Sequence, residues 1–157
     1  MKLVGITTIV LVTAVVLFLV YLAYLGHMSR SETITGLIDG KLAACPDKPN
    51  CVCSEYPNDT DHAIEPIAMH DPTNTVVLQS LKDIIEAQGG TVSITRENYI
   101  AATFSSAIFG FVDDLEIRTD AKAGVVHLRS ASRVGNSDFG VNSSRVDIIE
   151  KMYLEKQ

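Results

Sequence analysis

The hydrophobic residues of this chain are concentrated at its N-terminus. No charged residue occurs from Leu3 to Leu25, and Val, Leu, Ile, Ala and Phe fill most of these positions. A helix of about twenty such residues matches the ~30 Å hydrocarbon core of a bilayer at about 1.5 Å per residue. We therefore expect residues 1–26 to form a transmembrane anchor that contacts the lipid bilayer through residues 3–25.

Two other N-terminal signals share features with this segment. A cleaved signal peptide has an apolar region of only about 7–15 residues, whereas this longer run ends near the large side chains of Tyr24 and His27. The signal that precedes a lipid-modified cysteine resembles residues 42–45, but Asp39 and Lys41 separate them from the apolar run. The pattern therefore favours an uncleaved signal-anchor.

The charges beside the apolar run predict its orientation. Lys2 and the N-terminal amine are positive on the short side, whereas the charges of residues 27–41 nearly cancel on the other side. Positive charge is retained in the cytoplasm. We therefore expect a single-pass protein of the inner (cytoplasmic) membrane, with its N-terminus in the cytoplasm and its domain in the periplasm or an equivalent compartment.

After the apolar run, the pattern predicts a polar juxtamembrane linker over residues 27–43 and one soluble domain over residues 44–157. A domain of this length can bury one hydrophobic core. Its first part, residues 44–71, is rich in Pro, Asn, Asp and Cys and has no sustained periodicity. This composition predicts an ordered loop with a short extended stretch at residues 63–69.

The rest of the domain has helical and then strand-like periodicity. Apolar residues recur at helical spacing from Val77 to Ile85, between a cap at Asp71 or Thr73 and the glycines at 89–90. Strands are predicted at residues 91–95, 99–105, 111–119 and 125–131, and a last helix from about Asn142. We expect an α+β fold, in which a four-stranded antiparallel meander is covered by two helices (α-β-β-β-β-α).

The net charge excludes one class of partner. The chain of 157 residues carries a formal net charge of −6 at pH 7. An acidic surface repels the phosphates of DNA and RNA. We therefore expect no nucleic-acid partner.

All three cysteines, Cys45, Cys51 and Cys53, fall within nine positions. In an oxidising compartment this spacing favours a disulfide between Cys45 and Cys51. A metal site would combine Cys51 and Cys53 with His62 or His70, but zinc ligands are usually spaced Cys-x2-Cys or wider. Free thiols are the third alternative. We expect the two loop histidines to be solvated or capping, and we expect no cofactor and no metal.

The densest polar cluster lies on the third and fourth predicted strands. Alternation places Asp114 and Glu116 on one face of the third strand, opposite His127 and Arg129 of the fourth. We expect these residues to form a surface charge ladder, in which each pair contributes about 0.2–1 kcal/mol. The substitution Glu116→Ala should then scarcely change the stability.

The neighbouring Asp113 falls on the opposite, apolar face of the same strand. Because a buried carboxylate is costly unless it is paired, we expect Arg133 or Arg145 to reach it. This favours a structural ion cluster of Asp113, Asp114 and Glu116. The alternative is a catalytic acid/base pair, which is disfavoured because adjacent strand residues point to opposite faces.

A second interpretation of this region is a ligand-binding site. Residues 135–140 precede the predicted helix start, so backbone N–H groups at the positive end of a helix dipole could hold an anion there. The candidate ligand-binding residues are Arg129, Ser132, Arg133, Asn142 and Arg145. The sequence contains no Ser-His-Asp order, phosphate-binding glycine loop or zinc motif.

Three stretches together resemble a known family. They are Asn-Cys-Val at 50–52 after Cys45, Phe-Gly-Phe-Val-Asp-Asp-Leu-Glu at 109–116 after Phe-Ser-Ser at 104–106, and Arg-Ser-Ala-Ser-Arg-Val-Gly at 129–135 before Ser-Asp-Phe-Gly-Val-Asn at 137–142. Over roughly residues 44–153 the chain closely resembles the bacterial and plastid family named domain of unknown function 1499. The resemblance implies an envelope or membrane-associated protein and no particular reaction.

The chain departs from the family pattern at three positions. Cys53 stands where the family usually has serine, so the resemblance implies that Cys53 is the unpaired thiol. Asn136 and Ser143 replace what are commonly an aromatic and a basic residue. These two replacements weaken a ligand site built on residues 135–140.

The leading functional hypothesis is a membrane-tethered extracytoplasmic interaction or accessory module, which docks on another membrane or envelope protein and is not an enzyme. The second hypothesis is a binding domain for a small anionic or lipidic ligand, and the third is a hydrolase-like enzyme. An apolar pocket with Arg129 and Arg133 at its mouth would favour the second hypothesis. A packed domain with an apolar surface patch would favour the first.

Overall fold

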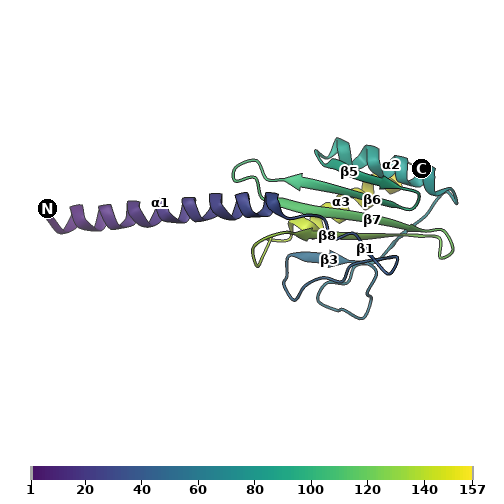
Figure 1. The fold of residues 1–157 in the computed structure, drawn as a ribbon, viewed down its shortest axis with the longest axis horizontal. Helices are drawn as coiled ribbons and strands as arrows, with labels where there is room; N and C mark the ends of the chain where they lie inside the picture. The colour runs from purple at the N-terminus through teal and green to yellow at the C-terminus, as the bar shows by residue number, and fades with distance from the viewer. Residues whose placement is uncertain (1, 157) are drawn as a thin grey trace.

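The computed structural model describes residues 2–156 and consists of one long helix joined to an α+β domain (Figure 1). Helix α1 (Lys2–Ser31) projects from one end of the domain, and the C-terminus lies at the opposite end. Its Val4–Ser31 portion is long and apolar enough to cross a membrane. Met1 and Gln157, the ends of the expected anchor and domain, lie outside the described residues.

The domain is built on one sheet of antiparallel pairs in the spatial order β3-β8-β7-β6-β5. The predicted meander corresponds to strands β5 (Thr91–Arg96), β6 (Tyr99–Ser105), β7 (Val112–Asp120) and β8 (Val125–Ser132). The sheet is nevertheless larger than the expected four strands, because β3 (Cys51–Cys53) and β4 (Ile67–Ala68) both pair with β8. Strands of two or three residues are too short to leave a periodic pattern, and here they cover an edge that would otherwise be unpaired.

Two helices cover one face of the sheet, as the periodicity predicts. Helix α2 (Asn74–Ala87) is followed by Gly89, whose φ of 83° ends the helix in a left-handed turn. Helix α3 (Val141–Glu155) packs beside α2 on the same face. The main hydrophobic core lies between these helices and the sheet and includes Leu81, Ile84, Leu115, Ile117, Leu128 and Ile149.

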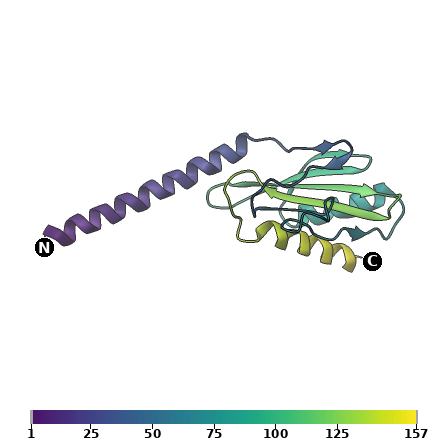
Figure 2. The ribbon, with the colours of Figure 1, turned by 90° about the horizontal axis from the view of Figure 1, so that it is seen from below.

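The opposite face of the sheet is also covered, which the sequence analysis did not expect. Strands β1 (Leu37–Ile38) and β2 (Lys41–Leu42) form a hairpin inside the stretch expected to be a polar linker. Figure 2 shows this hairpin on one side of the sheet and α3 on the other. The turn residues Asp39 and Gly40 both have positive φ, the geometry that Asp-Gly hairpins adopt. Leu42 is fully buried in a second cluster with Tyr99.

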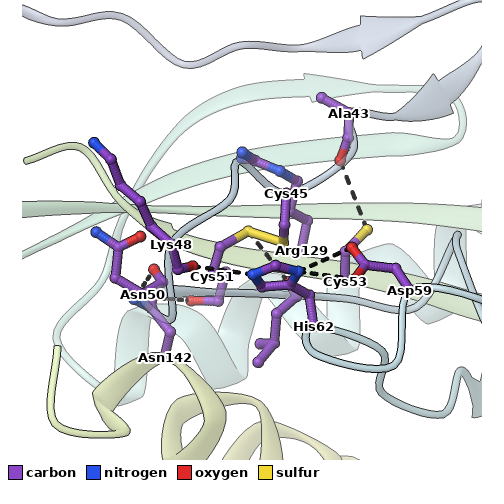
Figure 3. The surroundings of a disulfide bond; sticks show 12 residues. Ala43, Cys45, Lys48, Asn50, Cys51, Cys53, Asp59, His62, Arg129 and Asn142 are labelled. Carbon is purple, nitrogen blue, oxygen red and sulfur yellow. Dashed lines mark hydrogen bonds and ion pairs between the residues drawn. A yellow bond between two sulfur atoms is a disulfide. The ribbon is translucent and has the colours of Figure 1, made fainter. Parts of the chain in front are cut away.

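A disulfide joins Cys45 to Cys51 and fixes the start of β3 (Figure 3). Cys53 is free and buried, and burial raises the pKa of its thiol. His62 is buried rather than solvated: its Nδ1 atom donates to the Asp59 carboxylate at 2.9 Å, and its Nε2 atom donates to the Lys48 carbonyl at 3.0 Å. The bond to Asp59 raises the pKa of His62. The loop is therefore stapled twice, by a disulfide and by a buried histidine.

Replacing both bridged cysteines, Cys45→Ala with Cys51→Ala, should lower the free energy of unfolding. The bridge spans a sequence separation of 6, and a loop this short contributes about 2 kcal/mol by restricting the unfolded chain. Denaturant unfolding of the full chain in detergent micelles would measure the change. Cys53 should react with a maleimide only after unfolding, and a bridge to Cys53 in non-reducing peptide maps would refute the pairing.

Candidate functional site

The charged residues of the third and fourth predicted strands lie in a buried layer rather than on the surface. Glu116 of β7 is fully buried, and Asp114 is 5% exposed. The expected surface charge ladder is therefore wrong, although the predicted cross-strand pair of Glu116 with Arg129 is present. Alternation identifies which residues share a face, but it cannot show that residues 34–45 cover that face.

Glu116 is the centre of this layer. Tyr99 donates its hydroxyl hydrogen to Oε1 at 2.7 Å, and Arg129 Nη1 donates to Oε2 at 3.0 Å. The backbone N–H of Gly36, at the entrance to the β1–β2 hairpin, also donates to Oε1 at 2.9 Å. Burial, together with this bond to Glu116, raises the pKa of Tyr99, so its hydroxyl stays protonated as a donor. One carboxylate therefore joins β6, β8 and the covering segment.

Asp114 forms the second ion pair of the layer, with Arg133. The guanidinium donates twice, from Nη2 at 2.7 Å and from Nε at 2.9 Å, to Asp114 Oδ1. Its Nη1 atom donates to the carbonyl of Ser29 at 3.1 Å and to the carbonyl of Glu32. Arg133 therefore links β7 to the last turn of α1.

Asp113 lies on the helix-covered face, as predicted, and its partner is Arg145 rather than Arg133. Arg145 Nη2 donates to Asp113 Oδ2 at 2.7 Å, and the guanidinium carbon lies 4.5 Å from the centre of the Phe104 ring. Both side chains of the ion pair are only 10–15% exposed. The arrangement is that of a structural ion pair at the rim of the core.

Asn142 fastens the start of α3 to β8. Its side chain accepts a hydrogen bond from Ser130 at 2.6 Å and donates to Ser132 at 3.0 Å. It also donates to the carbonyl of Asn50, which precedes β3. Of the five candidate ligand-binding residues, the three arginines are therefore in ion pairs, and Ser132 and Asn142 bond each other. Each guanidinium is thus already paired with a carboxylate, although Arg129 Nε is buried without a hydrogen-bond partner among the described residues.

A second group of polar residues, not predicted from the sequence, lies at the end of the sheet away from α1. Glu55 and Arg118 form a buried ion pair in a cleft of about 660 Å³ that also exposes Lys41 and Glu65 at its rim. Nothing in the local pattern marks Glu55, because its partner is 63 residues distant in the chain. The tertiary fold alone brings this pair together.

Ser54 and His127 lie in the same cleft, with 3.1 Å between Ser54 Oγ and His127 Nδ1. Burial lowers the pKa of His127, so the ring is neutral at pH 7 and Nδ1 can accept the hydroxyl hydrogen. However, Ser54 Oγ also accepts the backbone N–H of Leu128 at 2.9 Å and is tied to β8. A hydroxyl in this position stabilises the strand end, and within residues 2–156 no carboxylate bonds His127 Nε2 to complete a triad.

No group of three or more His, Cys, Asp or Glu residues that could hold a metal ion occurs among the described residues. The thiol of Cys53 points instead toward the Ala43 carbonyl, at 3.7 Å (Figure 3).

Comparison with known proteins gives one match. The family model described as "Protein of unknown function (DUF1499)" matches residues 41–152, which is most of the chain. This match confirms the resemblance drawn from the three motifs. No curated protein and no solved structure matches the sequence.

Glu116→Ala should destabilise the protein strongly, in contrast to the expectation from alternation alone. The substitution leaves Arg129 buried without its carboxylate, a loss of about 3–5 kcal/mol. Asp113→Ala should have a smaller effect, because that ion pair is partly exposed. Thermal unfolding of the full chain in micelles would give this order, with Glu97→Ala on an exposed turn as the matched control. A Glu116→Ala melting temperature equal to that of the control would exclude a stabilising role for Glu116.

Proposed function

The chain belongs to the DUF1499 family, and we propose that it is a membrane-anchored, extracytoplasmic accessory module that presents its domain to another membrane or envelope protein. In this proposal α1 crosses the inner membrane once and the N-terminus is cytoplasmic. The domain carries out no reaction of its own. Its role is to hold a binding surface at a fixed height and orientation above the bilayer.

The observation that carries this proposal is the joint between α1 and the sheet. Ser29 Oγ accepts the backbone N–H of Val112 at 3.1 Å, at the first residue of β7. Arg30 donates to the carbonyls of Phe109 and Gly110, each at 3.3 Å. Together with Arg133, these bonds clamp the last turn of α1 against the start of β7. A domain on a flexible linker would have no such contacts.

Gly26 shows how closely α1 approaches the domain. A Cβ atom added at this residue would lie 2.0 Å from the Phe109 carbonyl oxygen. Only glycine permits this approach of helix to loop. A close, hydrogen-bonded joint transmits the orientation of the membrane helix to the domain, which is the property that a docking module needs.

The pairing of the arginines supports an interaction module over an anion-binding domain. Arg129, Arg133 and Arg145 each neutralise a carboxylate of β7. An anionic ligand would have to displace one of these buried partners, at the cost of a stranded charge. The disulfide supports an oxidising compartment, because such bonds persist outside the cytoplasm.

We propose that the partner protein docks on the cleft at the membrane-distal end of the domain. Its rim carries charges of both signs, from Lys41 and Glu65, over the buried pair of Glu55 and Arg118. Charges of both signs on the rim can pair with opposite charges on the surface of a partner protein, and such pairs fix the position in which the two proteins dock. A hydrolase-like function would have to use Ser54 and His127 in this same cleft.

An alkaline phosphatase fused to the C-terminus should be active, whereas a reporter that works only in the cytoplasm should be silent there. This result follows from the single crossing of α1 and from the positive-inside bias. Activity measured in intact cells would test it. The reverse pattern would place the domain in the cytoplasm and contradict the proposal.

A photo-reactive amino acid at Lys41 or Glu65 should give one discrete cross-linked product in native membranes, identifiable by mass spectrometry. The matched control is the same amino acid at Lys151, which is exposed on α3 away from the cleft. If neither Lys41 nor Glu65 yields a product, or if Lys151 yields the same one, the cleft is not the docking surface.

A further inference from the structure

Two connections of the domain extend back along α1 on its membrane side. The β6–β7 connection (residues 106–111) and the β8–α3 connection (residues 133–140) both lie at the end of the sheet from which α1 projects (Figure 1). Figure 2 shows the same two connections beside the helix from a perpendicular direction. The bonds of Arg30 to Phe109 and Gly110 fix the first connection against α1.

A cavity of about 420 Å³ separates the second connection from α1. Leu22 and Leu25 of α1 form one wall, and Val134, Phe139 and Val141 are among the residues of the others. Most of the exposed lining is apolar, and the polar residues Asp113 and Ser132 also line the cavity. Its volume falls in the range of about 300–1,000 Å³ that binds small molecules.

The helix residues in this wall set the height of the cavity relative to a bilayer. From Val4 to Leu25 is 22 residues, about 33 Å of helix at 1.5 Å per residue, against a hydrocarbon core of ~30 Å. Leu22 and Leu25 therefore lie in the last turn inside the apolar span. Any loop that contacts them lies at the surface of the lipid leaflet.

Both connections expose large apolar side chains at this height. Ile108 is 86% exposed and Phe139 is 98% exposed. Phe139 also has a φ of 57°, a left-handed conformation that is unfavourable for a bulky residue. The fold thus holds an exposed phenylalanine in a strained backbone conformation, which is an arrangement retained at functional sites.

The charges around the two connections do not oppose contact with lipid. Residues 106–111 contain no charged side chain. In the second connection, the Asp138 carboxylate accepts the backbone N–H groups of Gly140 and Asn142 at the start of α3. Arg30 is exposed beside the first connection, where a cation faces lipid headgroups favourably.

We propose that the two connections, residues 106–111 and 133–140, enter the lipid leaflet from which α1 emerges, so that Ile108 and Phe139 lie among acyl chains and one acyl chain fills the cavity beside Leu22 and Leu25. The inference rests on the crossing of the membrane by α1, as in the proposed function, but not on its direction. The docked module thereby has three contacts with the bilayer instead of one, which fixes the tilt of its domain.

Tryptophan fluorescence can test this directly, because the sequence contains no Trp. The variants Ile108→Trp and Phe139→Trp of the full chain would be reconstituted into phosphatidylcholine vesicles brominated near the headgroup end of one acyl chain. Both should lose most of their emission relative to vesicles of unbrominated lipid, and their emission should shift to shorter wavelength. Lipid brominated near the chain terminus should quench them less.

Two further variants act as controls. Val76 is half-exposed on α2, beside Lys156 near the C-terminus at the far end of the domain, so Val76→Trp should remain unquenched. Val15→Trp, near the middle of α1, should be quenched most by lipid brominated near the chain terminus. Circular dichroism would confirm that each variant retains the fold.

The outcomes separate the two proposals. Quenching of Val15→Trp without quenching of Ile108→Trp and Phe139→Trp would leave the anchor in place and overturn the lipid contact. The cavity beside Leu22 and Leu25 would then be open to a transmembrane helix of a partner protein. If Val15→Trp were also unquenched, α1 would not cross the membrane, and both the proposed function and this inference would fail.

Discussion

The fold depends on the pairing of the three carboxylates of β7 with three arginines. Asp114 and Glu116 are buried on one face of the sheet, and Asp113 lies at the rim of the other. A buried carboxylate without a partner would be strongly destabilising, so β8, the β8–α3 connection and α3 must each bring one arginine to this strand. Arg129, Arg133 and Arg145 meet that requirement, and their positions determine where those three elements lie.

The same pairing also explains how the anchor is attached. Arg133 binds Asp114 on one side and the carbonyls at the end of α1 on the other. The unsatisfied carbonyls of a helix C-terminus are natural acceptors for a guanidinium. A residue that stabilises the sheet therefore also fixes the direction in which the apolar helix leaves the domain. The anchor and the domain differ clearly in composition, but hydrogen bonds join the end of α1 directly to the domain.

The two ends of the domain differ in the chemistry that they expose. The end beside α1 presents apolar loop tips and an apolar cavity, whereas the distal end presents a polar cleft with charges of both signs. A module held between a bilayer and a second protein needs this division. The candidate ligand residues lie between these ends. Their arginines pair with the carboxylates of β7, and Ser132 bonds Asn142, so they belong to the framework of the module.

The sequence by itself determined the elements with strong periodicity: the apolar helix, the helix ending at Gly89, and the meander of β5 to β8. These follow from local pattern. The spacing of the cysteines favoured the pairing of Cys45 with Cys51 over a metal site or free thiols, and the family resemblance supported it. It also placed Asp113 opposite to Asp114 and Glu116, since alternation is a property of one strand. Only the tertiary structure decided that the second face is covered. The strands of the covering hairpin and β3 are only two or three residues long, so they leave no periodic pattern in the sequence. Glu55 is buried against Arg118, which is 63 residues distant in the chain. Burial at these positions depends on such distant contacts. The burial of Glu116 therefore could not be predicted from the residues next to it in the sequence.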